Sequence, residues 1–321
     1  MILDTAQVVG GLLLLFLGGG ALVRGAVALA RQLGISPLFV GLVVVGFGTS
    51  MPELVVSLEA ALKGSPDVAV GNVVGSNIAN MLLILGASAL VYPIRCAPQA
   101  VFRESLVMLA CCFFLAGLTE FGVIETWMGA AMVASIVGLI GYSYWSEKYR
   151  GAPSGELHVH EAAEFEDLSP KPWLIVATLG GGFVCLVGGA NMLIVGAVDI
   201  ARSVGISEGV IGLTLVALGT SLPELATSMI AALRKHSDIA VGNVLGSNIF
   251  NILSVLGLTA VVTPIPISAE LIDDAWIMAG VAVLLFSFLV TGWRVTRLVG
   301  ALFLICYGGY VAWLYDAFPT V

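Results

Sequence analysis

One segment of the chain occurs twice, and this duplication constrains the fold more than any other feature of the sequence. Residues 46–86 and 217–257 align without gaps at an offset of 171, with 24 of 41 positions identical. The similarity extends upstream, where residues 25–36 match residues 196–207 at 8 of 12 positions. The sequence therefore predicts two halves of similar structure.

The composition indicates an integral membrane protein. Of the 321 residues, 59% are hydrophobic and 11% are charged, and the mean hydropathy is +1.05. Soluble domains carry roughly 25% charged residues. The apolar runs are about twenty residues long and continuous, as membrane-spanning helices require, and lack the alternation of a membrane barrel. We expect an all-α, multi-pass protein of the cell (inner) membrane, with the lipid bilayer as its surroundings.

The apolar runs predict ten spans separated by one long polar stretch. A first five-helix half is expected over residues 1–145, an acidic linker over 146–171, and a second half over 172–321. The predicted spans are 6–30, 38–62, 68–91, 99–118, 122–145, 173–201, 209–233, 239–262, 271–292 and 296–315.

The spacing of the repeats predicts that the two halves are inverted. Corresponding helices lie five spans apart, and five is odd, so the second copy enters the membrane from the opposite side. Inverted repeats place a substrate site near the midplane of the bilayer. With the N-terminus outside, eleven Lys and Arg residues fall on the cytoplasmic side and two outside. This asymmetry predicts that orientation, with the linker in the cytoplasm.

The second span of each half carries Gly-Thr-Ser-x-Pro-Glu, ending at Glu53 and at Glu224. Pro52 and Pro223 have no N–H, so carbonyl groups in the preceding turn lose their helical partners. Such groups are tolerated in a membrane only where something else satisfies them, and a cation can do so. A carboxylate in each copy makes this the strongest candidate for a transport site.

The oxygen atoms of this motif suit calcium. Ca²⁺ takes about six to eight oxygen ligands, and two bidentate Glu side chains with one freed carbonyl from each half reach the lower end of that range. The two carboxylates also balance one divalent charge in a low-dielectric site. Soft ligands are missing from the motif, which disfavours zinc and copper.

The third span of each half carries Gly-Asn-x-x-Gly-Ser-Asn-x-x-Asn. Ser76 and Asn80, like Ser247 and Asn251, are four residues apart and share a helix face. Their neutral oxygens suit monovalent ions or water, whereas the alternative role is hydrogen bonding between helices. The first Asn of the motif, at positions 72 and 243, could equally hold the start of the helix or contact ions.

These duplicated motifs resemble the α-repeats of the sodium/calcium exchanger family, within the cation/calcium antiporter superfamily, and most closely those of a prokaryotic member. The resemblance implies exchange of Na⁺ for Ca²⁺ by alternating access, with electrogenic export of Ca²⁺. It implies that Glu53 and Glu224 bind both ions and that the carbonyls of Thr49 and Thr220 complete the Ca²⁺ site. The remaining residues that it implies line flanking Na⁺ sites or border the central one: Ser50, Ser221, Ser76, Ser247, Asn80, Asn251 and the backbone at Gly46 and Ala217.

One position separates this chain from potassium-dependent relatives, which carry Asp where this chain has Asn251. With Asn at both 80 and 251 the predicted site holds two carboxylates, which argues against co-transport of K⁺. Some prokaryotic members also have Asp there, so the charge of their sites differs from the charge expected here.

Other functions fit the sequence less well. A Ca²⁺/H⁺ antiporter of the same fold stays open, because two buried Glu side chains could exchange protons. An intramembrane enzyme would need a catalytic pair such as HExxH, and the spans contain none. No basic patch indicates nucleic acid, no cofactor motif is present, and the chain is expected to act as a monomer. His158 and His160 in the linker are predicted to lie in a solvated segment.

Overall fold

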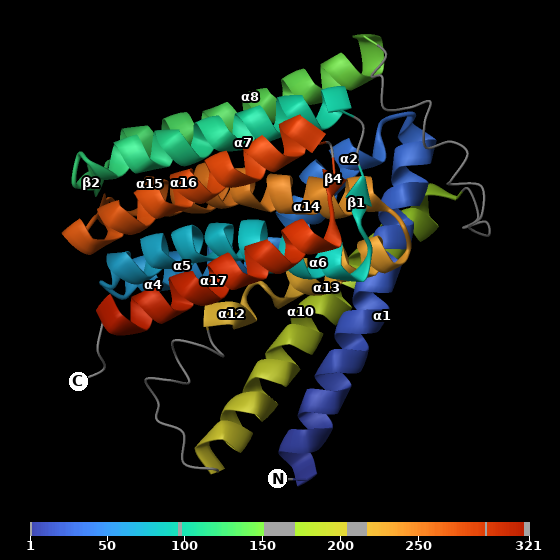
Figure 1. Ribbon diagram of the computed structural model, residues 1–321, viewed down its shortest axis with the longest axis horizontal. Helices are drawn as coiled ribbons and strands as arrows, with labels where there is room; N and C mark the ends of the chain where they lie inside the picture. The colour runs from blue at the N-terminus through green and yellow to red at the C-terminus, as the bar shows by residue number, and fades with distance from the viewer. Residues whose placement is uncertain (1, 96–97, 151–170, 204–216, 293, 318–321) are drawn as a thin grey trace.

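The computed structural model describes residues 2–95, 98–150, 171–203, 217–292 and 294–317. Helices make up most of this part of the chain (Figure 1), including three π-helical segments labelled η. The first half contains α1 (Ile2–Leu33), α2 (Pro37–Val40), η1 (Gly41–Val45), α3 (Gly46–Thr49), α4 (Met51–Leu62), α5 (Pro66–Ala79), η2 (Asn80–Ile84), α6 (Leu85–Val91), α7 (Pro98–Thr119) and α8 (Thr126–Arg150). The second half contains α10 (Pro172–Ser203), α12 (Ala217–Gly219), α13 (Leu222–Leu233), α14 (Ser237–Phe250), η5 (Asn251–Leu256), α15 (Gly257–Val262), α16 (Ala269–Gly292) and α17 (Arg297–Ala317).

The lengths of the described helices agree with most of the predicted spans. Eight helical stretches are long and apolar enough to cross a membrane, and the bent pair 37–62 supplies a ninth. The predicted span 209–233 begins in residues that the structure does not describe, and its described part contains α12 and α13. Helix α8 continues past the predicted span end at 145 to Arg150, so the linker begins later than expected. The rest of the linker, with His158 and His160, lies outside the described residues.

Helices α1 and α10 form a separate pair, inclined to the other helices (Figure 1). Their backbones are in close contact, because a methyl group on Gly18 would lie 2.7 Å from the carbonyl oxygen of Gly182. Likewise, a methyl group on Gly11 would lie 2.6 Å from the carbonyl oxygen of Gly189. Small residues commonly allow membrane helices to approach in this way. This pair contains the first span of each half.

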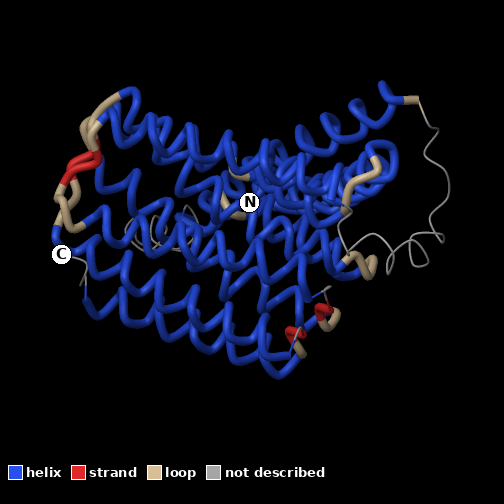
Figure 2. Tube along the Cα trace, turned by 90° about the horizontal axis from the view of Figure 1, so that it is seen from above, coloured by secondary structure: helices blue, strands red, loops and turns tan. Residues whose placement is uncertain are grey.

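In the described part of the chain, two pairs of short strands join the halves, which the all-α prediction did not include. Strand β1 (Ile94–Arg95) pairs with β4 (Arg294–Val295), and β2 (Val123–Ile124) pairs with β3 (Ile265–Pro266), both antiparallel. The pairs lie at opposite ends of the helical body (Figures 1 and 2). An offset of 171 maps Ile94 onto Ile265 and Val123 onto Arg294, so the repeat relates one pair to the other.

Among the residues that the structure describes, the buried apolar side chains form two clusters. The larger cluster joins α5, η2, α7, α14, η5 and α16, and the smaller one packs α1 against α10 and α13. Many large apolar side chains on the outside are exposed, among them Leu13 and Phe16 of α1 and Val184 of α10. A surface rich in exposed apolar side chains marks contact with lipid rather than water.

Candidate ion-binding site

The second span of each half is broken immediately before its Glu. Ser50 separates α3 from α4 with φ −81° and ψ 3°, and Ser221 has φ −88° and ψ 5° before α13. Each new helix has its Pro in the first turn, where a missing N–H is tolerated. In the first half, the second span (37–62) bends by 41° at this break. Glu53 and Glu224 follow in the first turn of the new helix, and both are 0% exposed.

The carboxylate of Glu53 contacts residues of the other half. Ser221 Oγ donates a hydrogen bond to Glu53 Oε1 at 3.2 Å. The same hydroxyl lies 3.3 Å from Ser76 Oγ. The second carboxylate oxygen, Glu53 Oε2, is buried without a hydrogen-bond partner. Glu53 therefore has one bonded oxygen and one that is free to bind a cation.

The carboxylate of Glu224 has fewer hydrogen bonds than that of Glu53. Both of its oxygens are buried without a hydrogen-bond partner, and so is Ser50 Oγ of the other half. Thr49 and Ser50 flank this carboxylate, and the charge of Glu53 is close enough to act on it. Neither Glu forms an ion pair with a described Lys or Arg. Two buried carboxylates without a counter-ion are costly in a membrane unless a cation joins them.

The hydroxyl of Thr49 connects the break in the first half to α14. Thr49 Oγ1 donates to Asn243 Oδ1 at 3.1 Å and lies 3.3 Å from Ser247 Oγ. Ser247 Oγ also lies within hydrogen-bond distance, 3.4 Å, of the carbonyl oxygen of Gly46. Close packing makes this possible, because a methyl group on Gly242 would lie 2.5 Å from Leu38 O. The structure thus brings three predicted site residues together from both halves.

The first Asn of each third-span motif holds helices together. Asn72 Nδ2 donates to Glu53 O at 3.2 Å and to Ser57 Oγ at 3.0 Å, and its Oδ1 accepts from Thr220 Oγ1 at 3.5 Å. Asn243 repeats this pattern, donating to Glu224 O at 3.3 Å and to a serine hydroxyl of α13 at 2.9 Å. These amides tie the third-span helices to the two Glu-bearing helices.

Asn80 and Asn251 each begin a π-helical segment, η2 and η5. Such segments widen one helical turn and occur often at functional sites. Each side chain donates through Nδ2 to an Asn of the other half, Asn248 or Asn77, at 3.1 Å. Each Oδ1 is buried and has no hydrogen-bond partner. Sequence reasoning missed Asn77 and Asn248, although the Ser-Asn pair is identical in both repeats.

The remaining predicted site residue, Ala217, is the first residue of α12. The other predicted residues line the contact between the two halves described above. The site has two carboxylates surrounded by neutral oxygens, and the described residues contain no group of three or more His, Cys, Asp or Glu that could hold a metal. Its unpartnered buried oxygens are those of Ser50, Glu53, Glu224, Asn80 and Asn251.

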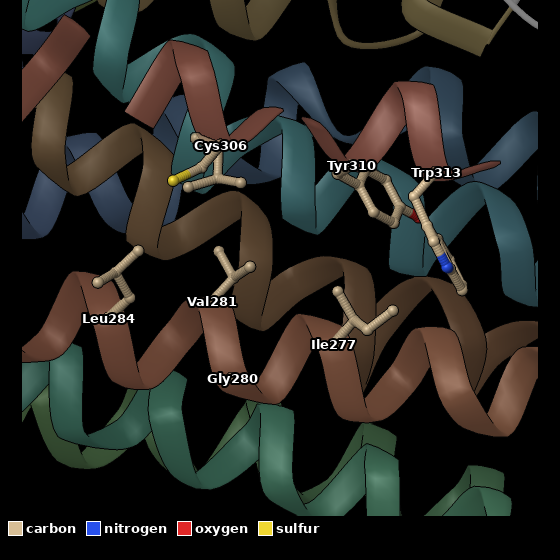
Figure 3. Close-up of a pocket in the computed structure, with 8 residues that line it drawn as sticks. Ile277, Gly280, Val281, Leu284, Cys306, Tyr310 and Trp313 are labelled. Atoms are coloured by element: carbon tan, nitrogen blue, oxygen red, sulfur yellow. The ribbon is translucent and has the colours of Figure 1, made fainter. Parts of the chain in front are cut away.

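An apolar hollow of about 440 Å³ lies outside this site, between α16 and α17. Figure 3 shows Ile277, Val281 and Leu284 of α16 on one side and Cys306, Tyr310 and Trp313 of α17 on the other. This lining offers almost no oxygen ligands, so the hollow does not fit a cation.

The fold and the site define a multi-pass membrane transporter for cations, and comparison with known proteins identifies its family. The profile described as "Sodium/calcium exchanger protein" matches residues 3–145 and 174–315. The chain belongs to this family, which confirms the resemblance seen in the sequence. Its relatives are transporters and not enzymes.

Similar proteins match over nearly the whole chain. Sodium/calcium exchanger MaX1 of Methanosarcina acetivorans is 31% identical over 95% of this chain and 96% of its own length. Inner membrane protein YrbG of Escherichia coli is 35% identical over 98% of this chain and 96% of its own. A solved structure of the sodium-calcium exchanger NCX_Mj superposes with a TM-score of 0.83 at 29% identity, covering 98% of this chain and 99% of that one. Together these similarities support cation/Ca²⁺ antiport.

Proposed function

We propose that the protein exchanges Na⁺ for Ca²⁺ by alternating access. The observation that carries the proposal is the set of buried oxygens without partners at the contact between the halves, on Glu53, Glu224, Asn80, Asn251 and Ser50. Buried polar atoms are nearly always hydrogen-bonded, so a group of unpartnered oxygens of one chemical kind indicates a ligand. The carboxylate and amide oxygens only accept, and the Ser50 hydroxyl can accept too, so a cation is the ligand that this set attracts.

Calcium is the divalent ion that fits these ligands. Its preferred ligands are carboxylate and carbonyl oxygens, at variable geometry. In our proposal Glu53 and Glu224 supply the charge, and the carbonyl oxygens of Thr49 and Thr220 at the two breaks complete the coordination. Asn80 and Asn251 border the ion with neutral oxygens.

Sodium binds in our proposal at flanking positions, where hydroxyl and carbonyl oxygens surround each carboxylate. Glu53 lies with Ser221 and Ser76 in one group. Ser247 lies beside the carbonyl oxygen of Gly46 in a second. In our proposal, Ser50 and the backbone of Ala217 take the corresponding roles in the other copy of the repeat. A proton needs no such set of neutral oxygens, so these groups favour Na⁺ as the coupling ion.

The remaining features follow from the two halves. We place residues 1–145 and 172–321 as inverted five-helix repeats in the cell membrane, with the N-terminus outside. The relative from Escherichia coli is described as an inner membrane protein, in keeping with this location. Because the proposed site holds two carboxylates and no third acid, we expect transport to be independent of K⁺. Exchange of more than two Na⁺ for each Ca²⁺ makes transport electrogenic, and the inward Na⁺ gradient then exports Ca²⁺.

Uptake of radiolabelled Ca²⁺ into proteoliposomes tests the proposal. Vesicles loaded with Na⁺ are diluted into Na⁺-free medium, and matched vesicles are loaded with K⁺ or choline or given a pH gradient. We expect uptake that requires internal Na⁺, ignores the pH gradient and grows with an inside-positive potential when Na⁺ leaves. Uptake that follows the pH gradient and is indifferent to Na⁺ would instead establish a Ca²⁺/H⁺ antiporter.

A further inference from the structure

We infer that Asn77 and Asn248 are positioning residues that aim the carbonyl oxygens of Asn251 and Asn80 at the transported cation. They also keep the site at two negative charges. This inference deepens the proposed function and rests on it. It assigns a role to two buried side chains whose polar atoms all have hydrogen-bond partners.

The orientation of the Asn77 amide follows from its partners. Its Nδ2 lies 3.3 Å from the carbonyl oxygen of Asn248 and 3.6 Å from the sulfur of Met278. A backbone carbonyl and a thioether can only accept hydrogen bonds, so the NH₂ group of Asn77 must face them. Its Oδ1 consequently faces Asn251, whose Nδ2 donates to it at 3.1 Å.

The second half repeats the arrangement with one difference. Asn248 Nδ2 donates to the sulfur of Met108 at 3.3 Å. Asn248 Oδ1 then accepts from Asn80 Nδ2 at 3.1 Å. The two pairs cross, because each orienting Asn lies in the half opposite to the Asn that it orients. The same hydrogen bonds therefore join the two halves and orient the ligand amides.

These bonds select one of the two orientations of each ligand amide. With Nδ2 of Asn251 held by Asn77, its Oδ1 is left buried and unpartnered. The opposite orientation would present an NH₂ group to a cation and repel it. The acceptor on Asn77 also requires a hydrogen-bond donor at position 251. An amide or a protonated acid satisfies it, whereas a carboxylate would place two acceptors in contact.

Leucine substitutions test the inference, since they remove both polar atoms and keep the branched outline of the side chain. We expect Asn77→Leu and Asn248→Leu each to raise the KM for Ca²⁺ about tenfold, the effect of losing one oriented ligand dipole. Thermal unfolding in detergent reports whether each variant is folded. A purely structural role would lower the amount of active protein and leave KM unchanged, which would overturn the inference. Thr119→Ala is the control and should leave KM unaltered, because it removes a buried hydroxyl at the end of α7 that donates to Ala116 O of the same helix.

A double-mutant cycle shows whether Asn77 acts through Asn251. In an Asn251→Ala background, Asn77→Leu should raise KM no further, whereas in an Asn80→Ala background it should still do so. Equal effects in both backgrounds would contradict the inference. If the leucine variants do not fold, Met108→Leu removes only the acceptor that orients Asn248 and should still raise KM. A wild-type protein without saturable Ca²⁺ uptake would overturn the proposed function itself, whereas normal wild-type uptake with unchanged KM in the variants would overturn this inference alone.

Discussion

The two Glu-bearing breaks come from nearly the same sequence, yet they differ in the structure. Glu53 has one oxygen held by Ser221, which also contacts Ser76. Glu224 has neither oxygen bonded, and Ser50, the counterpart of Ser221, has no partner. Identical residues thus occupy unequal environments within one conformation. In the proposed mechanism, inverted halves that exchange these two environments would open the site alternately to each side.

The carboxylates give the test with the largest expected effect. Glu53→Gln and Glu224→Gln each preserve shape and remove one charge, so the site can no longer balance a divalent ion. We expect each variant to lose Ca²⁺ uptake by at least about a hundredfold, because an uncompensated charge costs several kcal/mol at a buried site. Uptake per folded protein, with folding checked by size-exclusion chromatography, measures the loss. Full activity in either variant would show that the two-carboxylate site is wrong.

The next test converts a neutral ligand into an acid. In Asn251→Asp, the new acid must donate a hydrogen bond to Asn77 Oδ1, and only its protonated form can do so. We expect uptake near that of wild type at low pH and a loss of about tenfold as pH rises across roughly 6 to 9, where buried acids often titrate. The wild type, with Asn at this position, provides the matched profile. Superimposable profiles would mean that residue 251 does not face the ions.

Much of the fold and the site could be predicted because membrane chemistry leaves strong signals. Long apolar runs define spans, and a Pro-Glu pair inside such a run has few explanations besides a broken helix at a site. The family resemblance implies that Thr49 and Ser247 are site residues, and in the structure their hydroxyls lie within hydrogen-bond distance. They belong to different halves, so neither motif alone predicts their contact.

Other features depended on contacts that no local pattern encodes. The π-helical turns that begin at Asn80 and Asn251 were not predicted, because helical periodicity alone predicts regular α-helix there. Asn77 was missed because its neighbour Ser76 matched the family pattern and a buried Asn usually joins helices. The short strands were missed because two-residue pairings between loops leave no alternating pattern.

A smaller effect is expected from the serines at the two breaks. Ser221→Ala removes a hydrogen bond to a buried carboxylate, which contributes about 2 kcal/mol, whereas Ser50→Ala removes a hydroxyl that has no partner. In Na⁺-free and Ca²⁺-free detergent, Ser221→Ala should therefore unfold at a lower temperature than Ser50→Ala. With Na⁺ present, both should need more Na⁺ for half-maximal exchange. Equal unfolding temperatures in the ion-free state would show that the difference between the breaks has no energetic consequence.

The smallest expected effect distinguishes the two methionines whose sulfur atoms accept hydrogen bonds from Asn77 and Asn248. Asn77 keeps a backbone carbonyl acceptor when Met278 is replaced, whereas Asn248 Nδ2 donates to the sulfur of Met108. Met108→Leu should therefore raise the KM for Ca²⁺ about twofold, since a weak hydrogen bond to sulfur is lost, and Met278→Leu should leave it unchanged. The substitutions are matched in volume and burial, so a packing effect would appear in both. If Met278→Leu raised KM more than Met108→Leu, the carbonyl oxygen of Asn248 would not be what fixes the Asn77 amide.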